Sequence, residues 1–528
     1  MSNPTEIVLA ELIRDYAQEL PDAKILTFVS IAEDGGYEEE TRTYPQLYQH
    51  GQTLARALRA LGIGRADNVG LMMSNHPEFV ETMVATSIID AAFVPVDPRT
   101  RGAKLQYMLD FTECKGVICA DYCVESILAV AADCAQLQWL IVVDSGLPLT
   151  AGQSAQLATH RYVDMLKTPG PDLPLGEFSL DDPMFLMFTS GTTGNPKAVI
   201  NSHRKYMMMT QSPKVFGLTR ADKYYTGLSL THINAQGTLA GALGQAIPAV
   251  ISRKFTKSRL WDICRRYGCT SLNLLGGMIP ELYAVPEKPD DANNPVRHIQ
   301  SSGMPPHIWQ AFEKRFGVVL SEGYGATEGG AMRNPPGEGP VGSIGKPSFG
   351  WVAEILDENG NIAPPHVAGE ICFRREDGSP IVVHYYKNPG ASSDKVRDGW
   401  LHMGDIAHKD ENGWFYFHHR VGGGVRRNGD FVNTTLVESV LMNSPLVADV
   451  FVYGVATGKN VAGEKTLVAA IVPADKVSFN EAALLTYCRA HLEKNDLPEI
   501  IQVLDEIPKT ISEKPIEKAC IELLTFRE

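Results

Sequence analysis

The sequence predicts an α/β protein, with a large N-terminal domain of parallel α/β subdomains and a small β-barrel-like subdomain, followed by a small mobile α+β domain. Three observations predict this fold. Short apolar runs alternate with longer amphipathic stretches as far as about residue 340, as in parallel sheets covered by helices. Short strands with Asp-Gly or Asn-Gly turns follow them. Three consecutive glycines then precede the last hundred residues.

The N-terminal part opens with alternating helix and strand patterns. Leu47, Leu54, Leu58 and Leu61 recur at helical spacing, and Gly62 ends that helix. Buried strands are predicted at four apolar runs, residues 69–73, 93–96, 117–120 and 140–143. Amphipathic helices are predicted between them, at residues 77–92 and 104–111.

The second half changes character after about residue 340. Short strands are predicted at residues 351–357, 369–374 and 413–418. Gly422, Gly423 and Gly424 permit backbone conformations closed to other residues, which favours a hinge over a surface loop. Further helix and strand signals follow at residues 436–442, 449–453, 466–472 and 481–492. We therefore expect an N-terminal domain at 1–420, a hinge at 421–424 and a mobile domain at 425–528.

Composition excludes several classes of protein. The 528 residues carry a formal net charge of −14, whereas a surface that binds nucleic acid normally has a basic excess. No apolar run is long enough to span a bilayer, and the first residues do not form a signal core. The nine cysteines are scattered and fit no zinc pattern, and His418 and His419 are interpreted as structural. These features predict a cytoplasmic enzyme with reduced cysteines.

The strongest local signal is Thr189-Ser190-Gly191-Thr192-Thr193-Gly194-Asn195-Pro196-Lys197, which directly follows an apolar strand. Small residues let backbone N–H groups approach phosphate oxygens, the hydroxyls add donors, and the lysine adds positive charge. The spacing differs from that of the common P-loop. The string is too specific for an ordinary surface loop and predicts a phosphate-binding segment.

This string resembles the phosphate loop of the adenylate-forming superfamily, which includes acyl-CoA synthetases, luciferases and the adenylation domains of peptide synthetases. The resemblance extends from about Thr43 to Lys514, with further motifs in the family's order. It implies an acid–thiol ligase that uses ATP, Mg²⁺ and coenzyme A. The pattern is most similar to the crotonobetaine/carnitine–CoA ligase branch.

The resemblance also assigns nucleotide-binding roles. Tyr324 would stack on adenine, Thr327 would touch the phosphates, and Glu328 would ligate Mg²⁺, a cation that prefers oxygen ligands. Asp405 would bind the ribose. The full nucleotide set implied is Thr189, Ser190, Gly191, Thr192, Thr193, Gly194, Lys197, Ser302, Gly303, Glu322, Gly323, Tyr324, Gly325, Thr327, Asp405, Arg420 and Arg426. Taken singly, the segments at 322–328 and 302–305 each also fit a turn, and a lone Asp or Arg also fits a surface charge.

The catalytic residues implied are Lys514, Glu328 and His232. Residues 508–514, Pro-Lys-Thr-Ile-Ser-Glu-Lys, resemble the family's Pro-Lys-Thr-x-x-Gly-Lys, with Glu513 in place of the glycine. Lys514 would bridge the carboxylate and the α-phosphate, where a cation stabilises the transition state. Gly422 stands where the family usually has a hinge Asp or Lys.

The acyl pocket is expected around residues 230–236, where the resemblance places a gating histidine. This segment has no aspartate to pair with an amino group, which favours a coenzyme A ligase over an amino-acid activator and makes a betaine substrate unexpected. Gly276 and Gly277 leave room for a medium-sized or bulky apolar acid, or serve only a turn. The predicted lining is His232, Ile233, Asn234, Gln236, Gly276, Gly277, Met278 and Met304.

The expected partners are a small carboxylic acid and coenzyme A, without nucleic acid or a membrane span, and a homodimer is one option. Three other activities fit the same motifs: a ligase that loads a carrier protein, a luciferase-like oxygenase, and an inactive nucleotide-binding regulator. The identity of the acid and its pathway are not encoded in these motifs.

Overall fold

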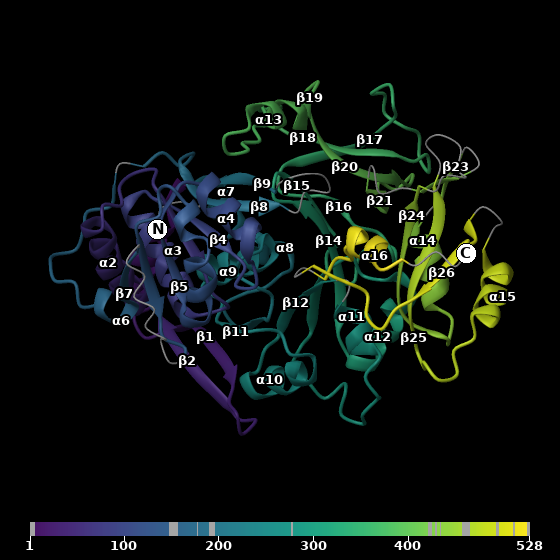
Figure 1. The fold of residues 1–528 in the computed structure, drawn as a ribbon, viewed down its shortest axis with the longest axis horizontal. Helices are drawn as coiled ribbons and strands as arrows, with labels where there is room; N and C mark the ends of the chain where they lie inside the picture. The colour runs from purple at the N-terminus through teal and green to yellow at the C-terminus, as the bar shows by residue number, and fades with distance from the viewer. Residues whose placement is uncertain are drawn as a thin grey trace. The chain divides into compact units, whose positions relative to one another are not determined.

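The computed structural model describes residues 6–146, 157–176, 178–189, 196–275, 278–420, 425–427, 430–432, 434–456, 465–492, 496–510 and 513–524. The chain divides into two compact units. Their helices and strands are labelled in Figure 1. Unit 1 comprises residues 1–273, 294–297 and 382–394, and unit 2 comprises residues 274–293, 298–381 and 395–528.

Unit 1 contains a sheet in the order β7-β6-β5-β3-β4-β8-β9. Its strands are β3 (Asn68–Met72), β4 (Ala92–Val96), β5 (Cys114–Ala120), β6 (Trp139–Val143), β7 (Ala158–Arg161), β8 (Pro183–Thr189) and β9 (Lys197–Ser202). Neighbouring strands are parallel except β8 and β9, which are antiparallel. Every residue of β3, β4 and β6 is buried, which confirms the predicted apolar strands.

A second group of strands in unit 1 comprises β1 (Lys24–Ile31), β2 (Tyr37–Thr43), β10 (Tyr224–Thr226), β11 (Ala249–Ser252) and β12 (Ser271–Leu275), of which residues 274–275 belong to unit 2. The pairs β1–β11, β10–β11 and β10–β12 are parallel, and β2 is antiparallel to β1. The helices of unit 1 are α1 (Leu9–Glu19), α2 (Tyr44–Ala60), α3 (Pro77–Ile89), α4 (Gly102–Phe111), α5 (Val124–Leu128), α6 (Tyr162–Met165), α7 (His203–Met209), α8 (Ser212–Val215), α9 (Ile233–Gln245) and α10 (Leu260–Tyr267), with α13 (Pro389–Lys395) at its boundary. The helix predicted at 77–92 ends earlier because Asp90 turns left-handed, with φ 57°.

Unit 2 contains β13 (His298–Ser302), which is parallel to β14 (Val319–Ala326). The strands β15 (Gly329–Arg333) and β16 (Lys346–Pro347) follow in antiparallel pairing. The helices here are α11 (Met278–Tyr283) and α12 (Trp309–Phe316). A separate antiparallel sheet contains β17 (Trp351–Leu356), β18 (Gly369–Arg375), β19 (Val396–Arg397), β20 (Trp400–Lys409) and β21 (Phe415–Arg420). This sheet corresponds to the predicted small β-subdomain.

The C-terminal part of unit 2 is α+β. In chain order it contains β22 (Val425–Arg427), β23 (Asp430–Val432), α14 (Thr434–Met442), β24 (Val447–Val455), β25 (Thr466–Pro473), α15 (Glu481–His491), β26 (Ile500–Val503) and α16 (Glu517–Glu522). Strand β25 pairs antiparallel with β24 and parallel with β26. The predicted fold class is therefore confirmed. The hinge at 421–424 lies outside the described residues, and the domain boundary there stays a prediction.

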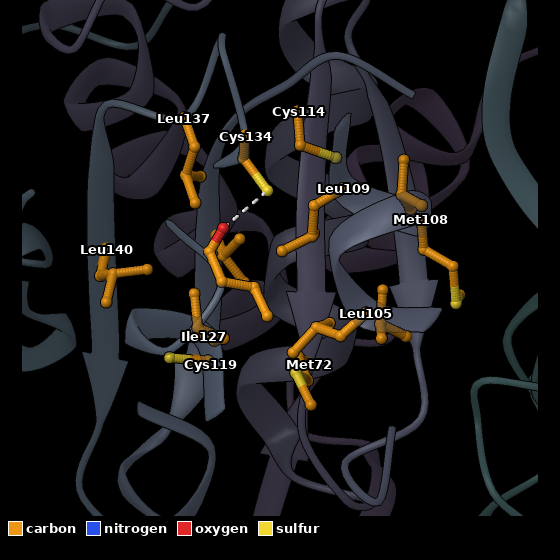
Figure 2. Close-up of a cluster of buried hydrophobic side chains, with 14 of the residues drawn as sticks. Met72, Leu105, Met108, Leu109, Cys114, Cys119, Ile127, Cys134, Leu137 and Leu140 are labelled. Carbon is orange, nitrogen blue, oxygen red and sulfur yellow. Dashed lines mark hydrogen bonds between the residues drawn. The ribbon is translucent and has the colours of Figure 1, made fainter. Parts of the chain in front are cut away.

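One core cluster of unit 1 is rich in sulfur, as Figure 2 shows. Cys114, Cys119 and Cys123 are buried, and the Cys134 thiol donates to the carbonyl of Val130 at 3.4 Å. All nine cysteines of the chain are free and buried. Burial raises the pKa of Cys114 and of Cys123 to about 12. Among the described residues, no helix is long and apolar enough to cross a membrane.

Candidate nucleotide-binding site

The predicted phosphate loop joins two antiparallel strands of unit 1. Thr189 ends β8 and pairs in register with Lys197, which begins β9, and the Thr189 hydroxyl donates to the Lys197 carbonyl at 3.3 Å. Residues 190–195, which include the predicted Ser190, Gly191, Thr192, Thr193 and Gly194, lie outside the described residues. The strand pairing therefore holds both ends of the loop at one place.

Lys197 lies beside an aromatic group of side chains. Its Nζ is 5.2 Å from the centre of the Tyr385 ring, a cation–π contact. An adjoining cavity of about 240 Å³ is lined by Tyr107, Phe111, Pro196, Lys197, Ala198, Tyr385, Tyr386 and Asn388. The aromatic contact restricts the lysine side chain at the end of the loop. Tyr385 was not among the predicted site residues, because its segment carries no phosphate-binding pattern.

In unit 2, Tyr324 and Asp405 meet although 81 positions separate them. The Tyr324 hydroxyl donates to Asp405 Oδ2 at 2.5 Å, and Asp405 pairs in register with Arg420 across β20 and β21. The Tyr324 ring is parallel to that of Phe373, with centres 6.3 Å apart and an interplanar angle of 11°. The structure thus brings together two predicted nucleotide residues and the backbone of a third. The side chains of Arg420 and Arg426 lie outside the description.

Glu322 joins β14 to the segment that follows β13. Its Oε1 accepts from the Gly303 N–H at 2.5 Å, and its Oε2 accepts from the Met304 N–H at 3.0 Å. Gly303 has φ 88°, a left-handed conformation that favours glycine. Burial raises the pKa of Glu322 to about 7, against the lowering effect of the two backbone donors. Glu322 therefore organises the loop at 302–304.

The remaining residues of this motif differ in accessibility. Thr327 is buried, and Glu328 is half-buried just after β14 ends. Gly323 is packed against Arg333, because an added Cβ would stand 2.8 Å from Arg333 Nη1. A Cβ on Gly325 would stand 2.9 Å from the Gly330 carbonyl oxygen. The Gly325 contact is with backbone, so close packing of β14 against β15 requires glycine there, whereas the Gly323 contact is with the end of the Arg333 side chain. Glu328 offers carboxylate oxygens, the ligand type that suits Mg²⁺.

Glu370, which was not among the predicted site residues, holds the backbone next to Asp405. Glu370 of β18 accepts from the Gly404 N–H at 2.8 Å, one residue before Asp405. The other Glu370 oxygen lies 2.8 Å from His402 Nδ1, which is also 3.4 Å from the Cys372 sulfur. Gly404 has φ 74°, so the strand turns where the glutamate holds it. The carboxylate therefore acts as a clamp on the Asp405 segment.

The donor atoms of Glu370, Cys372 and His402 lie within 4.8 Å of one another. The pKa of the Cys372 thiol is raised to about 12, chiefly by burial, which keeps the sulfur protonated at neutral pH. We interpret the group as a hydrogen-bonded cluster.

The predicted pocket segment forms the start of α9 in unit 1. His232 is its N-cap residue, and Ile233 and Asn234 are half-buried. Asn234 Oδ1 accepts from Asn273 Nδ2 at 2.6 Å. Gln236 is fully buried, and its amide donates to the Leu230 carbonyl at 2.6 Å, so it braces the turn before the helix. Of the remaining predicted wall, Met278 and Met304 are buried in unit 2, and Gly276 and Gly277 lie outside the described residues.

Lys514 stands in a tight hairpin of unit 2. The Thr510 N–H donates to the Lys514 carbonyl at 2.7 Å, and the Lys514 N–H donates to Thr510 Oγ1 at 3.1 Å. The Glu513 N–H donates to the Thr510 carbonyl at 3.0 Å, and Glu513 has φ 57°. Glycine is the residue that most readily adopts a left-handed conformation of this kind. This geometry explains the glycine of the family pattern, and Glu513 here adopts the conformation that glycine favours.

Comparison with known proteins places this arrangement in a family. A model described as AMP-binding enzyme matches residues 13–381, and one described as AMP-binding enzyme C-terminal domain matches residues 436–514. The medium/long-chain-fatty-acid–CoA ligase FadD17 of Mycobacterium tuberculosis is 31% identical over 503 residues, 94% of each chain. A crotonobetaine/carnitine–CoA ligase of Escherichia coli is 28% identical over 523 residues, 97% of this chain and 99% of that one.

Solved structures agree in fold. The anthranilate CoA ligase AuaEII in complex with anthranoyl-AMP has a TM-score of 0.85 at 21% identity, covering 98% of both chains. The o-succinylbenzoate CoA synthetase of Bacillus subtilis, in complex with ATP and a magnesium ion, has a TM-score of 0.77 at 22% identity, covering 97% of this chain and 99% of that chain.

The predicted resemblance is confirmed by a family model that covers more than half of the chain. The predicted set of ATP, Mg²⁺ and coenzyme A agrees at the level of the family with the ligands and names of these relatives. The chain therefore belongs to the AMP-binding enzyme family and is an enzyme of its acyl-CoA ligase group.

Proposed function

We propose that the chain activates a carboxylic acid with MgATP and transfers the acyl group to coenzyme A. In the first step a carboxylate oxygen attacks the α-phosphorus, and the bond to pyrophosphate breaks. In the second step the thiol attacks the acyl carbon, its proton is lost, and AMP leaves. The observation that carries the proposal is the 2.5 Å contact between Tyr324 and Asp405, which unites two motif residues from distant parts of the chain.

The residues contribute in distinct ways. Tyr324 and Asp405 would hold the adenosine, with Glu322 shaping the loop at 302–304. Glu328 has the oxygen donors to hold Mg²⁺, which would supply charge neutralisation at the phosphates. Lys514 would stabilise the charge that develops in the first step, and a swing of the domain at 425–528 about Gly422 would then withdraw it. His232 would border the acyl group.

We propose a medium-sized or bulky apolar acid, which includes cyclic acids, as the substrate. The relative named a medium/long-chain-fatty-acid–CoA ligase supports this size class. The segment at 230–236 carries no carboxylate for an ammonium group. A cytoplasmic location completes the proposal.

The test is a pyrophosphate-release screen of the purified chain against acetate, octanoate, laurate, benzoate and a steroidal acid. Each acid is assayed with coenzyme A, with a phosphopantetheinyl carrier protein, and with neither. We expect release with the larger acids and thioester formation on free coenzyme A. Equal or better turnover of acetate would contradict the substrate class, transfer only to the carrier protein would contradict the acceptor, and no ATP consumption with any acid would overturn the function.

A further inference from the structure

A distant segment of the chain covers the outer edge of β9, the strand that follows the predicted phosphate loop. Strand β9 is the last strand of its sheet in unit 1. The Ile200 N–H donates to the His384 carbonyl at 2.8 Å. The Tyr386 N–H donates to the Ala198 carbonyl at 2.8 Å, and Tyr385 bridges to the strand between these two bonds. The segment therefore pairs with a strand edge that would otherwise expose its N–H and C=O groups.

The same segment has further contacts that hold Tyr385 in place. The Tyr385 N–H donates to Ser392 Oγ at 2.9 Å. The Tyr386 hydroxyl donates to Glu113 Oε2 at 3.1 Å, and Lys387 Nζ lies 2.8 Å from the other oxygen of Glu113. That ion pair is exposed and contributes little by itself. The position of Tyr385 therefore depends mainly on backbone hydrogen bonds, which a change of its side chain leaves in place.

The Tyr385 ring forms a fixed surface for the Lys197 side chain. Tyr385 is buried, with 7% of its surface exposed, whereas Lys197 is exposed. Lys197 Nζ lies over the ring, 5.2 Å from its centre. At an exposed site such a contact contributes about twofold to fivefold in an equilibrium constant. The ring thus restrains a long side chain that otherwise loses much rotamer freedom when it binds an anion.

A ring face orients the ammonium group without neutralising its charge. Among the described residues, no carboxylate forms an ion pair with Lys197. A carboxylate would compete with the phosphates of ATP for the same ammonium hydrogens. The ring contacts one side of the group and leaves its other donors available. The contact therefore suits a lysine that has to bind phosphate.

The residue before the lysine contacts helix α4. The Tyr107 hydroxyl donates to the Pro196 carbonyl at 3.4 Å, and the Tyr107 ring stacks on Phe111 with centres 5.1 Å apart and an interplanar angle of 15°. Tyr107 and Tyr385 line the cavity of about 240 Å³ described above. Tyr107 therefore holds the backbone at the end of the loop, and Tyr385 holds the charge of Lys197.

We propose that Tyr385 is a positioning residue for the adenylation step, because its ring holds the Lys197 ammonium group at the end of the phosphate loop before ATP binds. The proposal rests on the function proposed above and adds a named residue to it. A lysine that is already restrained loses less conformational freedom when it meets the phosphates, which favours ATP binding and the departure of pyrophosphate. An acyl-adenylate carries no pyrophosphate group, so the second half-reaction should not depend on Tyr385.

The first experiment compares Tyr385→Leu and Tyr385→Phe with the unmodified chain. Pyrophosphate release is measured against ATP concentration, with the acid that is turned over fastest in the screen above. For Tyr385→Leu we expect kcat/KM for ATP to fall about fivefold, the upper end of the range for an exposed cation–π contact. Tyr385→Phe keeps the ring face and should stay within about twofold of the unmodified chain. Thioester formation from the supplied acyl-adenylate should keep its rate in both variants.

The second experiment asks whether the effect passes through the lysine. In the Lys197→Met background, Tyr385→Leu should lower kcat/KM for ATP by less than about twofold, because the partner of the ring is already gone. Installing 3,4,5-trifluorophenylalanine at position 385 keeps the shape of phenylalanine but withdraws electron density from the ring face. This variant should lose about as much as Tyr385→Leu with the packing of the ring retained, so the test stands even if the leucine variant folds poorly.

The control is Tyr37→Leu, because Arg266 Cζ lies 5.5 Å from the centre of the Tyr37 ring, which belongs to β2. Its kcat/KM for ATP should not change. The positioning role of Tyr385 would be overturned by an unchanged Tyr385→Leu, by equal losses in the leucine and phenylalanine variants, by parallel losses in both half-reactions, or by an undiminished effect in the Lys197→Met background. An unmodified chain that releases no pyrophosphate with any acid would instead refute the proposed function.

Discussion

The hydroxyl of Tyr324 donates to Asp405 Oδ2 at 2.5 Å, and this bond orients both the ring and the carboxylate of the proposed nucleotide site. A hydrogen bond to a charged acceptor contributes about 1.5–3 kcal/mol. Because Asp405 also lies opposite Arg420 in the sheet, the bond joins β14 to the β20–β21 pair.

Tyr324→Phe removes this bond and keeps the ring. We expect KM for ATP to rise about tenfold, because 1.4 kcal/mol corresponds to a factor of ten in an equilibrium constant. The measurement is pyrophosphate release against ATP concentration. Tyr267→Phe is the matched control, since Tyr267 donates to Glu39 at 2.7 Å on the exposed surface. Equal KM values in both variants would show that the bond has no role in nucleotide binding.

Glu370 should act through the segment that carries Asp405. We expect Glu370→Ala to raise KM for ATP several-fold more than it lowers kcat, because the Gly404 N–H loses its acceptor. Glu370→Gln should restore most of the affinity, since an amide oxygen can still accept that bond. Glu354→Ala removes an ion pair with Lys409 of β20 and serves as the control. A failure of Gln to rescue would argue against the hydrogen bond as the cause.

Lys514→Ala should separate the two half-reactions. We expect adenylation to fall by about 10²–10³, the scale of one lost electrostatic group. Thioester formation from a supplied acyl-adenylate should keep much of its rate, because in the proposed mechanism the lysine serves only the first step. Lys518→Ala, an exposed lysine of α16, should change neither rate. Parallel losses in both half-reactions would contradict the proposed domain swing.

Glu513→Gly tests the backbone of the lysine hairpin. Glu513 holds φ 57°, a conformation that costs about 1–2 kcal/mol for a residue with a side chain. Glycine removes this strain but adds unfolded-state entropy, so we expect unfolding in urea to require about 0.5–1 kcal/mol more. Glu506→Gly, at an exposed site that is not among the left-handed residues, should be neutral or destabilising. A lower free energy of unfolding for Glu513→Gly than for the unmodified chain would contradict backbone strain at Glu513.

Glu438 should make stability depend on pH. Burial raises the pKa of this carboxyl from 4.5 to about 7, while its Oε1 accepts from the Val452 N–H at 2.8 Å. Because folding raises this pKa, the carboxyl contributes its full share to the free energy of unfolding below pH 4.5. That share is lost as the pH rises through about 7. Glu438→Gln keeps the acceptor without the charge. The melting temperature of the variant should rise relative to that of the unmodified chain between pH 5 and 8. A difference that stays constant over this range would contradict the raised pKa of Glu438.

Local patterns predicted the framework well where burial is uniform along a strand. The apolar runs became β3 to β6 because both faces of that sheet are covered. The antiparallel pairing of β8 and β9 at the ends of the phosphate loop depends on register, which the apolar pattern of one strand does not define.

Contacts between distant segments could not be predicted. The bond from Gly404 to Glu370 spans 34 positions and depends on how β18 and β20 pair. The contact of His418, which was interpreted as structural, could not be predicted for the same reason. Its Nε2 lies 2.8 Å from Nδ1 of His408 on the neighbouring strand.

Because all nine thiols are buried, their reaction with an alkylating agent measures how often the surrounding structure unfolds. Thiolates, not thiols, react with alkylating agents, and the thiols of the core in Figure 2 are both enclosed and weakly acidic. Labelling of the native chain should therefore be slow and should follow transient unfolding. Mass spectrometry of the labelled peptides would then rank the sheets by their resistance to opening, without any introduced probe.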